Sequence, residues 1–246
     1  MRNAGVAGQM GKQVIVALDF ASGKEALDFL GLFAKSGRKP FVKIGMELFY
    51  AEGPEIVRKA KALGHKVFLD LKVHDIPNTA RRAMASVAAI GADIVNVHAA
   101  GGSAMMKAAL EGLAEGAGAG RKPLLIAVTQ LTSTDAATLR DELLISRPME
   151  ETVLSYARLA AASGLAGVVC SPLEAPAVKT ACGNGFLAVT PGVRFADGEV
   201  GDQKRVATPA DAARLGSDMI VMGRPITRAA DPAAAYARAC AEFGVS

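Results

Sequence analysis

The chain has 246 residues, of which 51% are hydrophobic and 5% aromatic, and its formal net charge is +4 at pH 7. This length is enough for one large core and lies in the size range of a single α/β barrel. The basic residues are spread thinly, without interleaved aromatic residues, which argues against a nucleic-acid surface and favours a mildly positive field for small anionic substrates.

The N-terminal segment shows neither a signal peptide nor a membrane span. Its first apolar run, residues 14–18, is closed by Asp19 and is too short for either. Cys170, Cys182 and Cys240 have no paired spacing, so neither a disulfide framework nor a thiolate metal site is indicated. We therefore expect a cytoplasmic protein that does not bind a membrane, with residues 1–12 as an N-terminal extension.

Short runs rich in Val, Ile and Leu recur along the chain and alternate with segments of helical apolar spacing. This alternation indicates a parallel sheet that is covered on its outer face. Eight such units predict a single-domain (β/α)8 TIM barrel over residues 1–246. An open doubly wound sheet is the alternative, but DFASGKE replaces the G-x-G-x-x-G turn expected after its first strand. The predicted strands are 13–19, 41–45, 66–72, 93–98, 123–129, 167–171, 186–192 and 218–223.

Several connections between these elements have distinct compositions. The Gly-rich stretch AEGAGAG, 114–120, predicts a flexible turn between the fourth helix and the fifth strand. His65 lies in a helix-to-strand turn and is expected at the surface. Longer connections, 130–149 and 195–208, follow the fifth and seventh strands. Long loops at the carboxyl ends of barrel strands usually belong to the active site.

Polar residues gather where the predicted strands end. Asp19 closes the first strand, Lys43 lies in the second, and Asp70, Lys72 and Asp75 lie in or just after the third. Barrel enzymes draw their catalytic groups from several strand ends on this face, so these side chains predict an active site. The fourth and fifth strands end in further polar residues, Asn96, His98, Thr129 and Gln130.

The third strand, in FLDLKVHDIPNT, carries charge where a core residue would be more stable. Alternate side chains of a strand share a face, so Asp70 and Lys72 are predicted to point the same way. Buried charges are costly unless they are paired, and Lys43, Asp70, Lys72 and Asp75 can alternate in sign. A protonated Lys72 could then donate a proton to a basic carbon or oxygen, and Asp70 could oppose a substrate carboxylate. Mg²⁺ binding by the same carboxylates is the alternative, but the Lys72 charge already takes the electrostatic role of a metal.

The last two strands run into turns that suit a phosphate. These are Pro191-Gly192-Val193-Arg194 and Gly223-Arg224-Pro225, at the places where this fold often binds phosphate. Glycine allows a close approach of the backbone, and the arginine guanidinium matches phosphate oxygens. The alternative is two ordinary turns with surface arginines.

The motif DLKVHDIPNT resembles the D-x-K-x-x-D-I-P-x-T signature of the orotidine 5′-phosphate decarboxylase family. VALDF, FVKIG, NVHAAGG, VTQLTS, TPGVR and GRPIT resemble other family marks, in order. The resemblance implies a carboxy-lyase that converts orotidine 5′-phosphate to UMP without a metal or organic cofactor, with Lys72 protonating C6 of the pyrimidine and Asp70 near the leaving carboxylate. A Mg²⁺-dependent sugar-phosphate decarboxylase or aldolase of the same superfamily is the nearest rival, because such enzymes share D-x-K-x-x-D. A non-catalytic barrel that serves as a binding protein is a rival of another class.

The resemblance also implies a homodimer whose active sites are shared across the interface. Asp75, Ile76 and Thr79 would serve the neighbour's site, where Asp75 completes the charge chain. The segment that contains Gln203 would close over the phosphate. The remaining substrate contacts implied are Asp19 and Lys43 at the ribose hydroxyls, Thr129 near the base, Gln203 between phosphate and pyrimidine, Pro191 beside the substrate, and Arg194, Gly223 and Arg224 at the phosphate.

Overall fold

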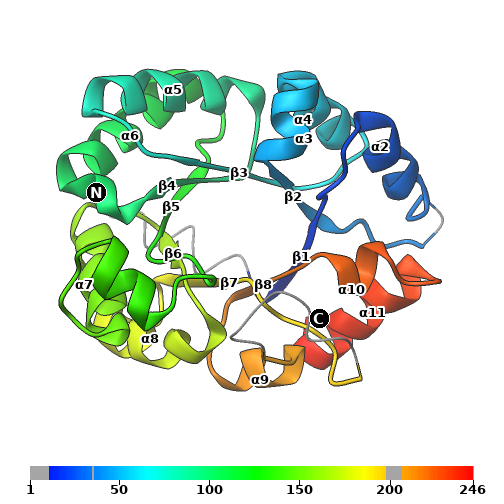
Figure 1. The fold of residues 1–246 in the computed structure, drawn as a ribbon. Helices are drawn as coiled ribbons and strands as arrows, with labels where there is room; N and C mark the ends of the chain where they lie inside the picture. Colours follow the sequence, from blue (N-terminus) through cyan, green and yellow to red (C-terminus); the bar gives the residue numbers. More distant parts are fainter. Residues whose placement is uncertain (1–10, 35, 198–206, 246) are drawn as a thin grey trace.

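Eight parallel strands close into a barrel in a computed structural model, which describes residues 11–34, 36–197 and 207–245. Each strand pairs with the next along the chain and the last pairs with the first, while the helices lie outside the ring (Figure 1). This arrangement confirms the predicted TIM barrel and excludes the open sheet. The strands are β1 (Gln13–Ala17), β2 (Phe41–Gly45), β3 (Val67–Val73), β4 (Ile94–His98), β5 (Leu124–Val128), β6 (Gly167–Val169), β7 (Leu187–Thr190) and β8 (Met219–Met222).

Several of the helices that cover the barrel begin with residues that favour helix starts. Ser22 accepts the backbone N–H of Glu25, Thr208 forms a capping box with Asp211, and Pro232 follows the cap residue Asp231. The helices are α2 (Gly23–Gly31), α3 (Met46–Glu52), α4 (Pro54–Ala62), α5 (Pro77–Ile90), α6 (Gly102–Ala117), α7 (Met149–Ala162), α8 (Ala175–Cys182), α9 (Pro209–Arg214), α10 (Arg224–Thr227) and α11 (Pro232–Phe243).

The strands are buried on both faces, which explains their near-continuous apolar sequences. In β1, Val14 and Val16 pack in the core outside the ring, whereas Ile15 and Ala17 belong to the core inside it. Full burial of one such aliphatic side chain contributes about 1.5–3 kcal/mol, so both layers hold the strands in place. The inner layer consists of Ile15, Ala17, Phe41, Phe68, Ile94, Leu124, Ile126, Ala166, Leu187, Val189, Met219 and Val221.

Helix α6 corrects the prediction of a flexible turn at 114–120. The helix continues to Ala117, so the first part of this stretch is helical. A Cβ atom at Gly112 would lie 2.0 Å from the carbonyl oxygen of Arg81, and one at Gly116 would lie 1.9 Å from that of Ala85. Both carbonyls belong to α5, which lies beside α6 (Figure 1). These two glycines therefore serve close packing of two helices, a requirement that the local sequence does not reveal.

The predicted surface position of His65 is wrong. The side chain is buried, and its Nδ1 atom lies 2.9 Å from the carbonyl oxygen of Pro40. Burial lowers the pKa of His65, and the nearby charge of Lys39 lowers it further, while the bond to Pro40 opposes both effects. His65 is buried because Pro40, which directly precedes β2 and is distant in the sequence, lies against it.

We expect the free energy of unfolding to fall as the pH drops below 6.5, the ordinary value of the histidine pKa, in part because of His65. Since the folded-state pKa is the lower one, the unfolded chain binds the extra proton between the two values. This stability is complete above the unfolded-state pKa and is lost as the pH falls toward the folded-state pKa. His65→Asn keeps an N–H for Pro40 but does not titrate, so urea unfolding should show a shallower loss for this variant. Equal pH slopes for the two proteins would contradict this role.

Candidate active site

Four side chains from the carboxyl ends of β1, β2 and β3 form a chain of alternating charge. Asp19 Oδ1 lies 3.1 Å from Lys43 Nζ, and this nitrogen lies 3.4 Å from Asp70 Oδ2. The other oxygen of Asp70, Oδ1, lies 2.8 Å from Lys72 Nζ. The barrel thus brings together four of the residues predicted to form the site, and each inner charge has an opposite charge on both sides.

Asp70 is the most deeply buried member of this chain. Burial on its own would raise the pKa of the Asp70 carboxyl group, but the charges of Lys43 and Lys72 and hydrogen bonds from Lys72 and Asn96 outweigh it. The pKa therefore lies below its ordinary value. Asp70 is a carboxylate at neutral pH and presents a fixed negative charge beside the Lys72 ammonium group.

The backbone of β3 departs from a regular strand at Lys72. Its φ angle is +50°, and the register between β3 and β4 shifts between Leu69 and Val73. A non-glycine residue in this left-handed region costs on the order of 1 to 3 kcal/mol, so the surrounding structure must hold it there. Strict alternation predicted that the Asp70 and Lys72 side chains point the same way. The two side chains do meet, but the strand between them departs from regular β geometry.

Two residues that the sequence-based analysis did not assign to the site support the charged chain. Asn96 of β4 accepts the backbone N–H of Lys72 at 2.8 Å through Oδ1 and donates to Asp70 Oδ1 at 2.6 Å through Nδ2. Gly45 leaves room for the Lys43 ammonium group, because a Cβ atom there would lie 3.0 Å from its Nζ. Asn96 was among the polar residues noted at the strand ends, but its position in the sequence does not reveal its contacts with β3.

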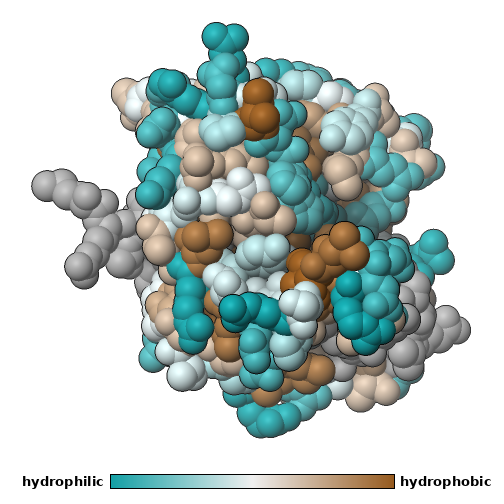
Figure 2. Space-filling model, turned by 60° about the vertical axis from the view of Figure 1, so that its left-hand side comes forward, coloured by the Kyte–Doolittle hydropathy of each residue, from teal (hydrophilic) through white to brown (hydrophobic). Residues whose placement is uncertain are grey.

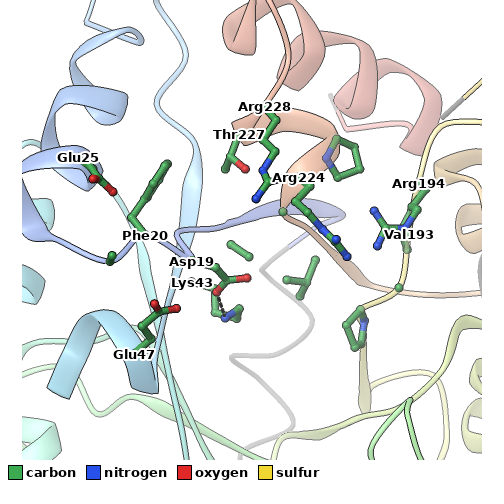
Figure 3. A pocket seen from close by; sticks show the side chains of 17 residues that line it. Asp19, Phe20, Glu25, Lys43, Glu47, Val193, Arg194, Arg224, Thr227 and Arg228 are labelled. Atoms are coloured by element: carbon green, nitrogen blue, oxygen red, sulfur yellow. Dashed lines mark hydrogen bonds and ion pairs between the residues drawn. The ribbon is translucent and has the colours of Figure 1, made fainter. Parts of the chain in front are cut away.

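A cavity of about 660 Å³ opens beside Asp19 and Lys43. Arg194, Arg224 and Arg228 line one side of it, and Glu25 and Glu47 line the opposite side (Figure 3). Arg194 follows β7 and Arg224 begins α10 after β8, so the two predicted phosphate turns meet at one cavity. Pro191 and Gly223 line the same cavity. The arginine side offers guanidinium groups to an anion.

A smaller cavity of about 220 Å³ lies next to the first. Lys43, Pro191 and Val221 line both cavities, so the two adjoin. The smaller cavity contains the Asp70–Lys72 pair, and most of its other lining residues are apolar: Phe68, Val128, Leu131, Val169, Cys170, Pro191 and Val221. Together the cavities form a mainly apolar chamber that holds the Asp70–Lys72 pair and, adjoining it, a charged chamber with arginines on one side.

Asp75, Ile76 and Thr79 are exposed, and they lie just after β3 and at the start of α5. Asp75 Oδ1 accepts the backbone N–H of Ile76, and the described part of the chain offers it no ion pair. Within one chain, therefore, Asp75 does not join the charge chain of Lys43, Asp70 and Lys72. Its predicted role in a neighbouring subunit's site stays a prediction.

Thr129 was predicted to lie near the base, but it lines neither of these two cavities. The Thr129 hydroxyl group donates to the carbonyl oxygen of Val169 at 3.0 Å, and the residue lines a third cavity together with His98. Burial lowers the pKa of His98, and the charges of His74 and Lys72 add to this effect. Gln203 lies outside the described residues. A contact of Thr129 or Gln203 with a substrate stays a prediction.

The described residues contain neither a cluster of metal-binding side chains nor a helix suited to cross a membrane. Within 11–34, 36–197 and 207–245, no three His, Cys, Asp or Glu side chains are grouped so that they could hold a metal ion. Over these same ranges, none of the helices combines the length and the apolar character that a membrane crossing requires.

The closed barrel, with charged cavities at the carboxyl ends of its strands, defines a TIM-barrel enzyme. The chain belongs to the orotidine 5′-phosphate decarboxylase / HUMPS family, whose model matches residues 12–239.

Individual relatives agree with this assignment. Orotidine 5′-phosphate decarboxylase of Bacillus caldolyticus is 62% identical over 225 residues, which are 91% of each chain. The protein of the same name from Geobacillus sp. (strain WCH70) is 58% identical over 230 residues, 93% of this chain and 95% of its own. A crystal structure of orotidine 5′-phosphate decarboxylase from Lactobacillus acidophilus has a TM-score of 0.84 at 44% identity, covering 95% of this chain and 100% of that one.

Proposed function

We propose that the chain converts orotidine 5′-phosphate to UMP and CO₂ without a metal or organic cofactor. The observation that carries this proposal is the Asp19–Lys43–Asp70–Lys72 chain, which joins an apolar chamber to an arginine-lined one. A pyrimidine fits the apolar chamber, a ribose fits beside Asp19 and Lys43, and a phosphate fits beside Arg194 and Arg224. The relatives named orotidine 5′-phosphate decarboxylase support the same assignment.

The charged chain suggests how the reaction proceeds. The substrate carboxylate would lie beside Asp70, so that repulsion between two carboxylates is relieved as CO₂ leaves. The bond between C6 and the carboxyl carbon breaks, and its electron pair remains on C6. Lys72 Nζ then transfers a proton to C6, which gives UMP and a neutral amine that solvent reprotonates. Asp70 holds the ammonium group in position at 2.8 Å before the transfer.

The phosphate group would contribute to catalysis from a distance. Arg194 and Arg224 line the larger cavity and Lys72 lines the smaller one, so the groups proposed to bind the phosphate are not those that face C6. Binding energy from a remote group can be used to align the reacting centre, and truncated substrates then lose turnover as well as affinity. The segment that contains Gln203 is proposed to close over this phosphate.

Adding the protein to orotidine 5′-phosphate should remove the ultraviolet absorbance of the orotate ring, with and without EDTA. A metal-free mechanism requires no chelatable ion, so the two initial rates should agree. Activity that EDTA abolishes and Mg²⁺ restores, measured with sugar phosphates in parallel, would favour the rival sugar-phosphate enzyme. Binding of UMP without any absorbance change in the substrate assay would favour a non-catalytic barrel.

We further propose that the active form is a homodimer with shared sites. Ile76 is 67% exposed and Leu144 is 82% exposed, and both are large apolar residues. Leu144 also has a left-handed backbone, with φ +56°, in the connection between β5 and α7, where Leu131 and Leu143 are exposed as well. Figure 2, in which the side with α6 and α7 is turned forward, shows apolar side chains grouped among polar ones. Asp75 directly precedes Ile76 in the chain. A second copy that covers Ile76 would therefore bring its own Asp75 to the interface, from which we propose that it completes the active site of the first copy.

A further inference from the structure

Asn96 is a buried polar residue in the middle of β4 and is 1% exposed. Its neighbours Val95 and Val97 belong to the apolar core between the strands and the helices. None of the cavities described above is lined by Asn96. The side chain is therefore not exposed to the cavities proposed to hold the substrate, and its polarity needs another explanation.

The two hydrogen bonds of Asn96 allow only one orientation of its amide group. The backbone N–H of Lys72 can only donate, so the amide atom 2.8 Å from it must be the oxygen. The amide nitrogen then faces the Asp70 carboxylate at 2.6 Å, which can only accept. One side chain thus joins the backbone of Lys72 to the carboxylate of Asp70, and both of its polar atoms are satisfied.

These bonds act where β3 is irregular. The register with β4 shifts between Leu69 and Val73, and the left-handed Lys72 lies inside that interval. The Asp70 oxygen that Asn96 contacts, Oδ1, is also the one that lies 2.8 Å from Lys72 Nζ. The amide therefore restrains both ends of the pair: the backbone from which the ammonium group extends and the oxygen that the ammonium group contacts.

We infer that Asn96 is a positioning residue, whose amide bridge sets the Asp70 carboxylate and the Lys72 ammonium group in the geometry needed for protonation of the substrate carbon. The inference deepens the proposed function and rests on it. Because a misplacement of about 1 Å can cost roughly 100-fold in rate, loss of the bridge should reduce kcat strongly. Since Asn96 lines none of the cavities, KM and the affinity for UMP should change little.

The first experiment replaces Asn96 by Leu, which is similar in size and makes neither hydrogen bond. We expect kcat to fall by about 100-fold with UMP affinity kept within about tenfold. Ser217→Ala is the matched control. Like Asn96, Ser217 is buried, hydrogen-bonded and absent from the lining of the cavities, but its partner is Thr190 at 3.0 Å and not the Asp70–Lys72 pair. This control should lose thermal stability and keep kcat. Wild-type kcat in folded Asn96→Leu would overturn the inference.

The second experiment, Asn96→Asp, is nearly isosteric and serves if the Leu variant does not fold. The new carboxyl group can accept a hydrogen bond from the Lys72 N–H. It can donate one to the Asp70 carboxylate only while it is itself protonated. The charged groups around this pair are Lys43 from β2, Lys72 from β3 and Asp19 beyond Lys43, and the titratable His98 of β4 lies nearby. The ratio of wild-type to variant kcat should therefore rise with pH, by up to about tenfold per unit.

The outcomes separate the inference from the proposed function. A kcat ratio that rises with pH supports the bridge. A constant loss of about 100-fold in Asn96→Asp supports it as well, because both carboxylates of that variant are then ionised throughout the pH range. Wild-type kcat at alkaline pH, or a loss that shrinks as the pH rises, overturns it. If the wild-type protein does not decarboxylate orotidine 5′-phosphate, the proposed function fails first. If the wild type is active and both Asn96 variants match it, only the inference fails.

Discussion

A Lys72→Ala protein is expected to lose nearly all turnover of orotidine 5′-phosphate and still to bind UMP. The ammonium group of Lys72 lies 2.8 Å from Asp70 at the edge of the apolar chamber, where it is the proposed proton donor to C6. General acid catalysis typically supplies about 100- to 10,000-fold in rate, so kcat should fall at least that far. Initial rates by absorbance and UMP binding by calorimetry measure the two effects separately.

Two further variants sharpen this test. Lys72→Arg keeps a positive charge beside Asp70 but cannot give up a proton readily, so it should also be nearly inactive if proton donation is the role. Lys66→Ala removes an exposed lysine just before the same strand, and it should keep wild-type kcat. A Lys72→Ala enzyme that retained a large fraction of the wild-type rate would show that another group protonates the carbon.

Mixing two inactive variants, Asp70→Ala and Asp75→Ala, is expected to restore activity if the sites are shared across a dimer. In a mixed dimer, the Asp75→Ala chain supplies an intact Asp70 and Lys72, and its partner supplies an intact Asp75. One of the two sites is then complete, while the other carries both lesions. Random exchange makes half of the dimers mixed, so activity should recover to roughly one quarter of the wild-type value.

A second mixture controls for effects of exchange itself. Asp70→Ala and Lys72→Ala lesions fall in the same half of the site, because these side chains lie 2.8 Å apart in one chain. Their mixture should therefore stay inactive at every ratio. Subunit exchange can be verified with differently tagged chains. Absence of recovery in the Asp70→Ala and Asp75→Ala mixture, after verified exchange, would argue against a shared site.

The fold could be predicted because its signals are local. Each strand is an apolar run ended by polar or turn residues, and each helix has an apolar stripe, so the alternation is visible without knowing any contact. The charged residues Asp19, Lys43, Asp70 and Lys72 were predictable for a related reason. Parallel strands that alternate with helices bring all their carboxyl ends to one side of a barrel, and the order of the chain then places these residues together.

Errors arose where a residue's environment depends on partners distant in the chain. His65 has the sequence context of a surface turn, but Pro40 lies against its ring. Gly116 belongs to a stretch with the composition of a flexible linker, but the carbonyl of Ala85 leaves no room for a side chain. Residue type and local spacing carry no information about such contacts.

The amino-acid sequence by itself determined the number and order of the barrel's strands and which charged residues stand at their ends, because hydrophobic periodicity is a property of neighbouring residues. Only the tertiary structure decided how those charges are held. The left-handed backbone of Lys72, the amide bridge of Asn96 and the junction of the two cavities at Lys43 all arise between strands. Distances between atoms on different strands follow from closure and register of the whole barrel, which no local segment encodes.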